Sequence, residues 1–307
     1  MRIKWFGYEA VLVALTVVVM LVAWRLDPQF VSFETQRELI GLIWEPALIA
    51  LAMTLVVLTG GIDLSVGATM SLSGVAFGLV YEKGQPAWVC AAVALSVGGV
   101  CGLLNGAVVT KLRIHPLIVT LGTLAGFYGL AEGISQGRPI SGFEENLEIG
   151  PGVPAVAVMT ASVALAVFLS ATVAGRSVFA IGLNEEAARY SGLRVDRIKA
   201  GLYVLCGVIA SLAAVFYAAR RNTVKADIGQ GMELDVITAV VLGGTAVTGG
   251  RGGVVGTLAG LFLLHEVQRF VTWHWEREEL NLIVVGSILI VAVLANTLLR
   301  QAAKVAQ

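Results

Sequence analysis

One carboxylate lies between two long apolar runs of the sequence. Residues 58 to 67 read "LTGGIDLSVG", and Asp63 follows the paired glycines Gly60 and Gly61. Glycine readily adopts the positive φ that ends a helix, and an acid can cap the next helix by accepting its first N–H groups, here near Val66. The stretch therefore predicts a helix break pinned by Asp63. The alternative is a proton or substrate ligand, because acids at membrane depth are often functional.

A second glycine-rich stretch, 233 to 260, reads "ELDVITAVVLGGTAVTGGRGGVVGTLAG". Its glycines interrupt helical structure and expose backbone amides, which a membrane protein tolerates only where the chain is buried in protein or lines a watery cavity. We expect a translocation path lined by Gly243, Gly244, Gly249 and Gly250. A tight turn between two spans is the alternative.

The longest basic loop, about 175–199, reads "GRSVFAIGLNEEAARYSGLRVDRIK". It is not apolar enough to span a membrane. Within it, "NEEAARYSG" predicts a short helix with an asparagine cap and acids in its first turn. Such a surface helix can dock a partner protein, and a plain solvated connector is the alternative.

Several kinds of chemistry have no support in the sequence. None of the six lysines belongs to a G-x-x-x-x-G-K-[ST] loop, so ATP hydrolysis is expected in a separate chain. No H-E-x-x-H or G-x-S-x-G motif is present, and the three cysteines lie in apolar runs without a C-x-x-C spacing. We expect a protein that is not an enzyme and has no cofactor, no metal site and no nucleic-acid partner.

The elements that position these residues are membrane spans. Hydrophobic residues make up 57% of the 307-residue chain and charged residues 14%, against about 25% charged residues in soluble domains. The predicted fold is an all-α, polytopic transmembrane bundle with about ten spans, one or two of them broken or re-entrant. The candidate spans are 7–24, 39–60, 63–81, 87–110, 115–133, 153–174, 200–219, 233–248, 253–272 and 280–299. The short 233–248 segment is the candidate re-entrant one, and 39–60 with 63–81 is a candidate for one broken element.

Basic residues and glycines add two expectations about the bundle. The distribution of Lys and Arg favours cytoplasmic N- and C-termini with the 175–199 loop inside, although "RRNTVK" at 220–225 then falls outside. Glycines spaced at four form one row at 98, 102 and 106 and another at 252, 256 and 260. We expect these rows to pack helices closely within this chain, with a dimer seam as the alternative.

These stretches together resemble the permease subunits of bacterial ABC importers for monosaccharides, such as the ribose, xylose and rhamnose permeases. The resemblance covers about residues 40 to 295, including "LTGGIDLSVGATMSLSG", "HPLIVTLGTLAGFYGLAEGIS", "GLNEEAARYSGLRVDRIK" and the 233 to 260 stretch. It implies a single transmembrane permease domain over residues 1–307 in the bacterial inner membrane. The segment from about 175 to 199 would be its cytoplasmic coupling loop.

The resemblance also implies partners. These are a cytoplasmic ABC ATPase subunit, a second permease that is identical or related, an extracytoplasmic sugar-binding protein, and membrane lipid. In the loop, the E-A-A-x-x-x-G pattern of importers matches Glu186, Ala187, Ala188 and Gly192, while the hydrophobic-x-Leu-Pro continuation of many importers is absent. These four residues are therefore expected to couple the permease to its ATPase.

Two other classes of function are consistent with the sequence. A proton- or cation-coupled secondary transporter of a small polar solute, titrating Asp63 or Glu266, would work without an ATPase. A membrane scaffold would need no substrate path at all. Within the importer hypothesis, ribose, xylose, rhamnose and autoinducer 2 are all candidate substrates, because the binding protein usually sets specificity.

Overall fold

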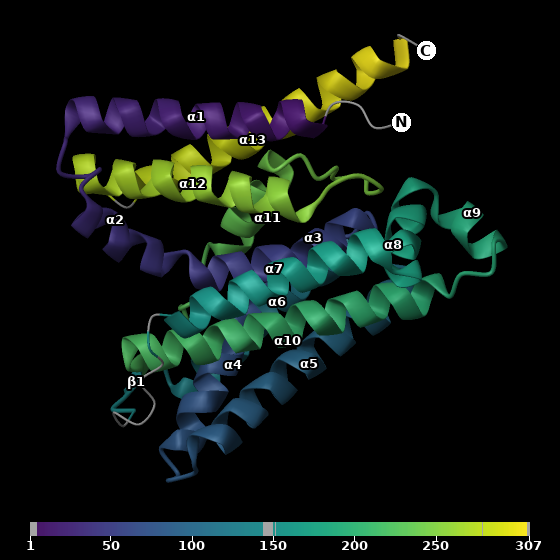
Figure 1. Cartoon of the computed structure of the whole chain (residues 1–307). Coiled ribbons are helices and arrows are strands. Elements are labelled where there is room, and N and C mark those ends of the chain that lie inside the picture. The colour runs from purple at the N-terminus through teal and green to yellow at the C-terminus, as the bar shows by residue number, and fades with distance from the viewer. Residues whose placement is uncertain (1–4, 144–149, 151, 278, 306–307) are drawn as a thin grey trace.

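The fold of this chain is an all-helical bundle, seen in a computed structural model that describes residues 5–143, 150, 152–277 and 279–305 (Figure 1). The first half contains α1 (Trp5–Leu26), α2 (Phe33–Leu39), the 3₁₀ helix η1 (Ile40–Leu42), α3 (Trp44–Leu58), α4 (Val66–Tyr81), α5 (Ala87–Lys111), α6 (Pro116–Ser135) and β1 (Ile140–Ser141). The second half contains α7 (Gly152–Ala171), α8 (Val173–Leu183), α9 (Glu185–Tyr190), α10 (Val195–Arg221), β2 (Thr223–Val224), α11 (Met232–Leu242), α12 (Val254–Trp275) and α13 (Glu279–Val305).

The core of the bundle is built around α3. Every residue of α3 from Ala47 to Leu58 is buried, and α10 and α11 pack against it. The outer helices α1, α5, α6 and α7 instead bury between 11% and 28% of their apolar windows. Because these exposed faces are apolar, they suit a hydrocarbon environment or a partner in the membrane.

The predicted fold class is confirmed, and the structure refines the spans. Within the described residues, six helices are long and apolar enough to cross a membrane, and the α2–α3 pair, bent by 48°, makes a seventh. The other three candidate spans correspond to the shorter helices α4 and α11 and to α13, whose described apolar stretch covers Glu279–Leu294. With 11 residues, α11 is about 16 Å long, so it reaches only about half-way through a 30 Å hydrocarbon layer.

The first glycine row packs helices together inside this chain as expected, and so does the second except for Gly252, which precedes α12 and lies against the side chain of Thr245. At Gly98, Gly102 and Gly106 of α5, an added Cβ would lie within 3 Å of atoms of α10. At Gly256 and Gly260 of α12 it would meet the backbone of Gly243 and Ala239, at the end of α11. In lipid, such close backbone contact replaces the hydrophobic drive that packs helices in water.

The bundle has two distinct ends. α1 begins, α13 ends and α9 projects at the same end, on the right in Figure 1. At the opposite end, a two-residue antiparallel pairing joins β1 to β2, with Ile140 opposite Val224. The segments predicted to be cytoplasmic therefore gather at one end, and "RRNTVK" lies at the other.

Candidate functional site

Two interrupted helices end in the same way. α3 and α11 both end after the sequence Val-Val-Leu, at Leu58 and Leu242, and a glycine with positive φ follows two residues later, Gly60 at 76° and Gly244 at 86°. Each end carries the paired bonds of a Schellman cap. These bonds are Gly60 N to Val57 O at 2.9 Å, Gly61 N to Val56 O at 3.1 Å, Gly244 N to Val241 O at 2.9 Å and Thr245 N to Val240 O at 3.1 Å.

Asp63 lies in the first break but does not cap α4 as predicted. The N-cap of α4 is Ser65, which makes no side-chain cap bond. Oδ1 of Asp63 instead accepts from the amide of Ser65 at 2.9 Å and from its Oγ at 2.7 Å. Asp63 is two residues too early to reach the amides near Val66, so it closes a turn of the Asx type before the helix begins.

The Asp63 turn is tied to two neighbouring helices. Nδ2 of Asn105, on α5, donates to Ser65 Oγ at 2.7 Å, and Thr123 on α6 donates to Asn105 Oδ1 at 2.8 Å. Asp63, Ser65 and Asn105 are each no more than 2% exposed. A buried polar network of this kind rigidifies its surroundings when its members are satisfied, which favours a structural role for Asp63.

The two glycine breaks meet at one point, which we call the glycine junction: Leu58, Gly60, Gly182, Gly249 and Gly250. The amide of Gly250 donates to the carbonyl of Leu58 at 2.9 Å. A Cβ at Gly182, on α8, would lie 1.9 Å from Leu58 O and 2.3 Å from Gly250 N, and one at Gly249 would lie 2.7 Å from Gly60 N. Three separate segments therefore touch through backbone atoms alone.

The glycines expected to line a path pack against protein in this conformation. Gly243 lies against the backbone of Gly256, Gly244 against the ring of Tyr8, and Gly249 and Gly250 within the glycine junction. The tight turn considered as the alternative describes this arrangement. A translocation role for these glycines stays a prediction that requires the segments to separate.

The predicted short helix in the basic loop is present as α9. Its N-cap is Asn184, whose side chain accepts from the Ala187 amide at 3.0 Å. Ala188 packs with Ile181 and Val195, whereas Glu186 and Ala187 are exposed. The loop is shorter than expected, because α8 extends to Leu183 and α10 starts at Val195; Gly192, at φ 85°, makes the turn between α9 and α10.

Charged side chains hold α9 against the first turns of α10. Arg189 donates to Glu185 at 2.9 Å and also pairs with Asp196, and Lys199 donates to Glu185 at 2.9 Å. Partial burial would raise the pKa of Glu185, but the bonds from Arg189 and Lys199 outweigh that effect and the pKa is lowered. α9 is therefore presented as an ordered surface element.

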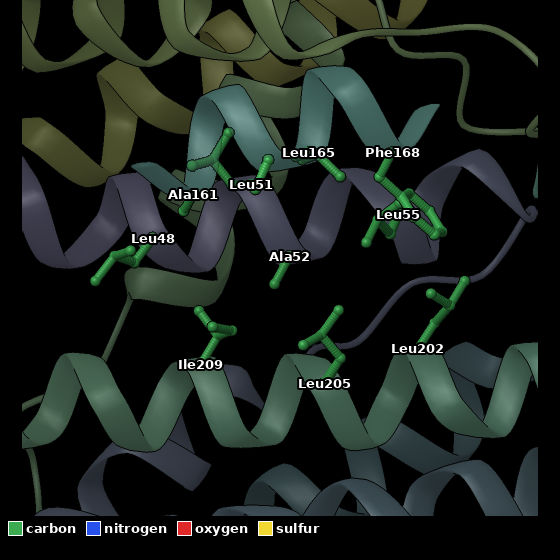
Figure 2. Close-up of a pocket in the computed structure, with 11 residues that line it drawn as sticks. Leu48, Leu51, Ala52, Leu55, Ala161, Leu165, Phe168, Leu202, Leu205 and Ile209 are labelled. Atoms are coloured by element: carbon green, nitrogen blue, oxygen red, sulfur yellow. The ribbon is translucent and has the colours of Figure 1, made fainter. Parts of the chain in front are cut away.

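Two cavities differ in the polarity of their linings. A pocket of about 530 Å³ separates α9 from the α5–α6 corner and is lined by charged groups that include Arg113, Glu185 and Glu186. A groove of about 270 Å³ is lined by α3, α7 and α10, all of its lining side chains are apolar, and Figure 2 shows Leu51, Phe168 and Leu205 among them. Because these side chains offer no hydrogen-bonding group, this groove does not suit a hydroxylated solute.

The sequence analysis missed a buried ion pair at the other end of the bundle. Arg220, in the last turn of α10, donates to Glu45 in the first turn of α3 at 2.9 Å. Glu45 is 5% exposed. The only signal in the sequence was an acid at the start of one apolar run and two adjacent arginines at the end of another. The paired residues lie 175 positions apart.

The arrangement defines a class of protein. Interrupted helices that meet inside a multi-pass bundle, with irregular backbone covered by protein, are a construction typical of membrane transport proteins. The chain is a multi-pass membrane protein of this class.

Comparison with known proteins gives the family. The chain belongs to the family described as "Branched-chain amino acid transport system / permease component", whose profile matches residues 39–293. It is 35% identical over 303 residues to the ribose import permease protein of Escherichia coli K12, covering 95% of this chain and 94% of that protein. No solved structure matches significantly.

Other relatives are import permeases as well. The ribose import permease protein of Bacillus subtilis 168 is 36% identical over 280 residues, covering 88% of this chain and 87% of that protein. The autoinducer 2 import system permease protein of Escherichia coli K12 is 30% identical over 316 residues, covering 97% of this chain and 94% of that protein. The predicted kinship with permease subunits of sugar ABC importers is confirmed.

Proposed function

We propose that this chain is the membrane-spanning permease subunit of an ABC importer for a monosaccharide, in the inner membrane of a bacterium. The single observation that carries the proposal is its 35% identity to a ribose import permease over 95% of the chain. Ribose is the first candidate substrate for that reason. A separate ATPase subunit, an extracytoplasmic sugar-binding protein and a second permease complete the importer.

α9 is the proposed contact with the ATPase. Its exposed Glu186 and Ala187 belong to the E-A-A-x-x-x-G pattern, while Ala188 anchors the helix on its buried side. The charged pocket beside α9 makes this surface concave, and the α5–α6 corner lines its other side. A segment of the ATPase seated there would touch two loops of the permease at once.

The connection from α9 to the glycine breaks supports a coupling role. α9 follows α8 through Asn184 alone, and α8 carries Gly182 into the glycine junction. A displacement of α9 by the ATPase would therefore act directly on the ends of α3 and of the segment after α11. Such a displacement shifts the balance between inward-open and outward-open states when the packed elements have two discrete arrangements.

The test is a reconstituted importer. The tagged chain is purified from its native membrane in mild detergent, co-purifying proteins are identified by mass, and the recovered complex is placed in vesicles. We expect a P-loop ATPase among them and uptake of labelled ribose, xylose or rhamnose that requires ATP and the binding protein. Uptake by the permease alone, driven by a proton gradient, would instead establish the secondary transporter.

A further inference from the structure

A charged cavity lies at the end of the bundle opposite α9. Its volume is about 150 Å³, and it is enclosed by η1, the start of α3, the end of α10, the start of α11 and α12. A water molecule takes up about 30 Å³ in the liquid, so the space corresponds to about five waters and has room for several hydroxyl groups of a ligand. The polar residues of its lining are Glu45, Tyr217, Arg220, Arg221, Asp235 and Arg269.

Two acids and three arginines line this cavity, and one acid and one arginine form an ion pair. Both carboxylate oxygens of Glu45 accept from Nη1 of Arg220, at 2.9 and 3.2 Å. Asp235 accepts from Nε2 of Gln268 at 2.9 Å, and Arg269 lies on the same wall. A carboxylate has about four acceptor positions and a guanidinium five donors, so the Glu45–Arg220 pair retains capacity for further hydrogen bonds.

An aromatic ring completes the lining. The guanidinium carbon of Arg221 lies 6.0 Å from the ring centroid of Tyr217, and both side chains face the cavity. Side chains with many hydrogen-bond donors and acceptors beside one aromatic ring suit a hydroxyl-rich ligand.

The cavity is also linked to the glycine junction. Asp235 lies in the first turn of α11, and the chain that follows the other end of α11 carries Gly249 and Gly250. The helix between them is about 16 Å long. A ligand bound against Asp235 would therefore act on the segment after α11, which α8 contacts in the glycine junction.

We propose that this cavity is the outward-facing sugar subsite of the permease, where Glu45, Arg220 and Asp235 hydrogen-bond to the hydroxyls of a monosaccharide. The inference rests on the proposed function, because it assumes that α9 faces the cytoplasm and that a sugar enters from the opposite side. It assigns a substrate contact that lies apart from the glycines of the two breaks.

The test uses the whole importer with a cysteine placed in the cavity. The three native cysteines are buried, so Met232→Cys offers a thiol in the cavity lining to a charged methanethiosulfonate reagent added from outside. We expect the transported sugar among ribose, xylose and rhamnose to slow this labelling. Lys83→Cys, exposed at the same end but outside the cavity, is the control that no sugar should protect.

A second variant tests whether Asp235 contributes to the protection of Met232→Cys by sugar. Asp235→Asn keeps Oδ1 as an acceptor for Gln268 but removes the charge, so we expect roughly tenfold more sugar to be needed for protection and for uptake, as for a lost charge-assisted hydrogen bond. Glu82→Gln is the matched control, because Glu82 is an exposed acid at the same end that pairs with Arg138.

The outcomes separate the two proposals. A wild-type importer that transports none of the three sugars overturns the proposed function and this inference with it. A wild-type importer that transports a sugar, with labelling of Met232→Cys unaffected by that sugar, overturns the inference alone. If Asp235→Asn needs the same sugar concentration for protection and for uptake as the unmodified permease, Asp235 does not contact the sugar.

Discussion

The amide of Gly250 donates a 2.9 Å hydrogen bond to the carbonyl of Leu58, and this bond joins the two interrupted helices of the bundle. Leu58 is the last residue of α3, and Gly250 lies in the segment between α11 and α12. The bond is buried beneath α8 at Gly182. Any opening of one break therefore affects the other.

Gly182→Ala is expected to reduce transport strongly. The new Cβ would lie 1.9 Å from Leu58 O and 2.3 Å from Gly250 N, and both are backbone atoms that move only with their segments. Overpacking of this kind costs about 1–3 kcal/mol. Uptake by the reconstituted importer and the thermal stability of the permease measure the effect. Gly201→Ala is the control, because no atom of the described chain outside its own helix lies within 4 Å of its Cβ position. Normal uptake by Gly182→Ala would show that the segments of the junction can separate without loss of transport.

Glu186→Lys is expected to uncouple ATP hydrolysis from uptake while the permease still inserts and folds. Glu186 is exposed on α9, so its replacement disturbs a contact with the ATPase more than the fold. Sugar-stimulated ATPase activity and uptake are measured together in vesicles. Glu34→Lys makes the same charge change on α2, at the other end of the bundle. Equal uptake by both variants would remove Glu186 from the docking surface.

Asp63→Asn is expected to retain most of the uptake. Asparagine keeps the Oδ1 acceptor that Ser65 uses through its amide and its hydroxyl. Asp63→Leu removes that acceptor and leaves buried donors unsatisfied, at a cost of about 1–3 kcal/mol each, so we expect a lower melting temperature and little uptake. A folded Asp63→Asn protein without uptake would point instead to a titrating carboxylate.

Acid is expected to loosen α9. The pKa of Glu185 is lowered in the folded protein, so its pairs with Arg189 and Lys199 stabilise the loop at pH values above the ordinary glutamate value of about 4.3. That contribution is lost as the pH falls from there through the lowered pKa. Hydrogen exchange of the α9 amides at neutral pH and near pH 3.5, corrected for intrinsic rates, measures it. Glu185→Gln should abolish the part of the pH dependence of exchange that comes from Glu185. The same pH dependence in Glu185→Gln and in the unmodified protein would show that the Glu185 pairs do not stabilise α9.

Local features of the site were predictable from the sequence because short-range rules determine them. The asparagine cap of α9 and the glycine ends of α3 and α11 each depend on residues within one turn. Asp63 was placed in the correct break but assigned the wrong amides. The sequence did not reveal that the helix starts only after Ser65.

Contacts between distant segments were not predictable. The Glu45–Arg220 pair joins residues 175 positions apart, and the glycine junction brings together three segments that span positions 58 to 250. Hydropathy identified every helix of the bundle core, and the shortness of the 233–248 run marked it as the candidate re-entrant segment. α11 is short because its glycines end it after 11 residues.

The α5–α10 contact also constrains how this protein can diverge. Every coded amino acid other than glycine carries a Cβ, and at Gly98, Gly102 and Gly106 that atom would fall between 1.7 and 2.8 Å from atoms of α10. No single replacement at these positions avoids a collision, so tolerated change there requires a simultaneous shift of the other helix. By contrast, Gly122, Gly126, Gly129 and Gly133 of α6 have nothing within 4 Å of their Cβ positions within the described chain. Within this chain, packing therefore fixes the glycines of α5 and does not constrain those of α6.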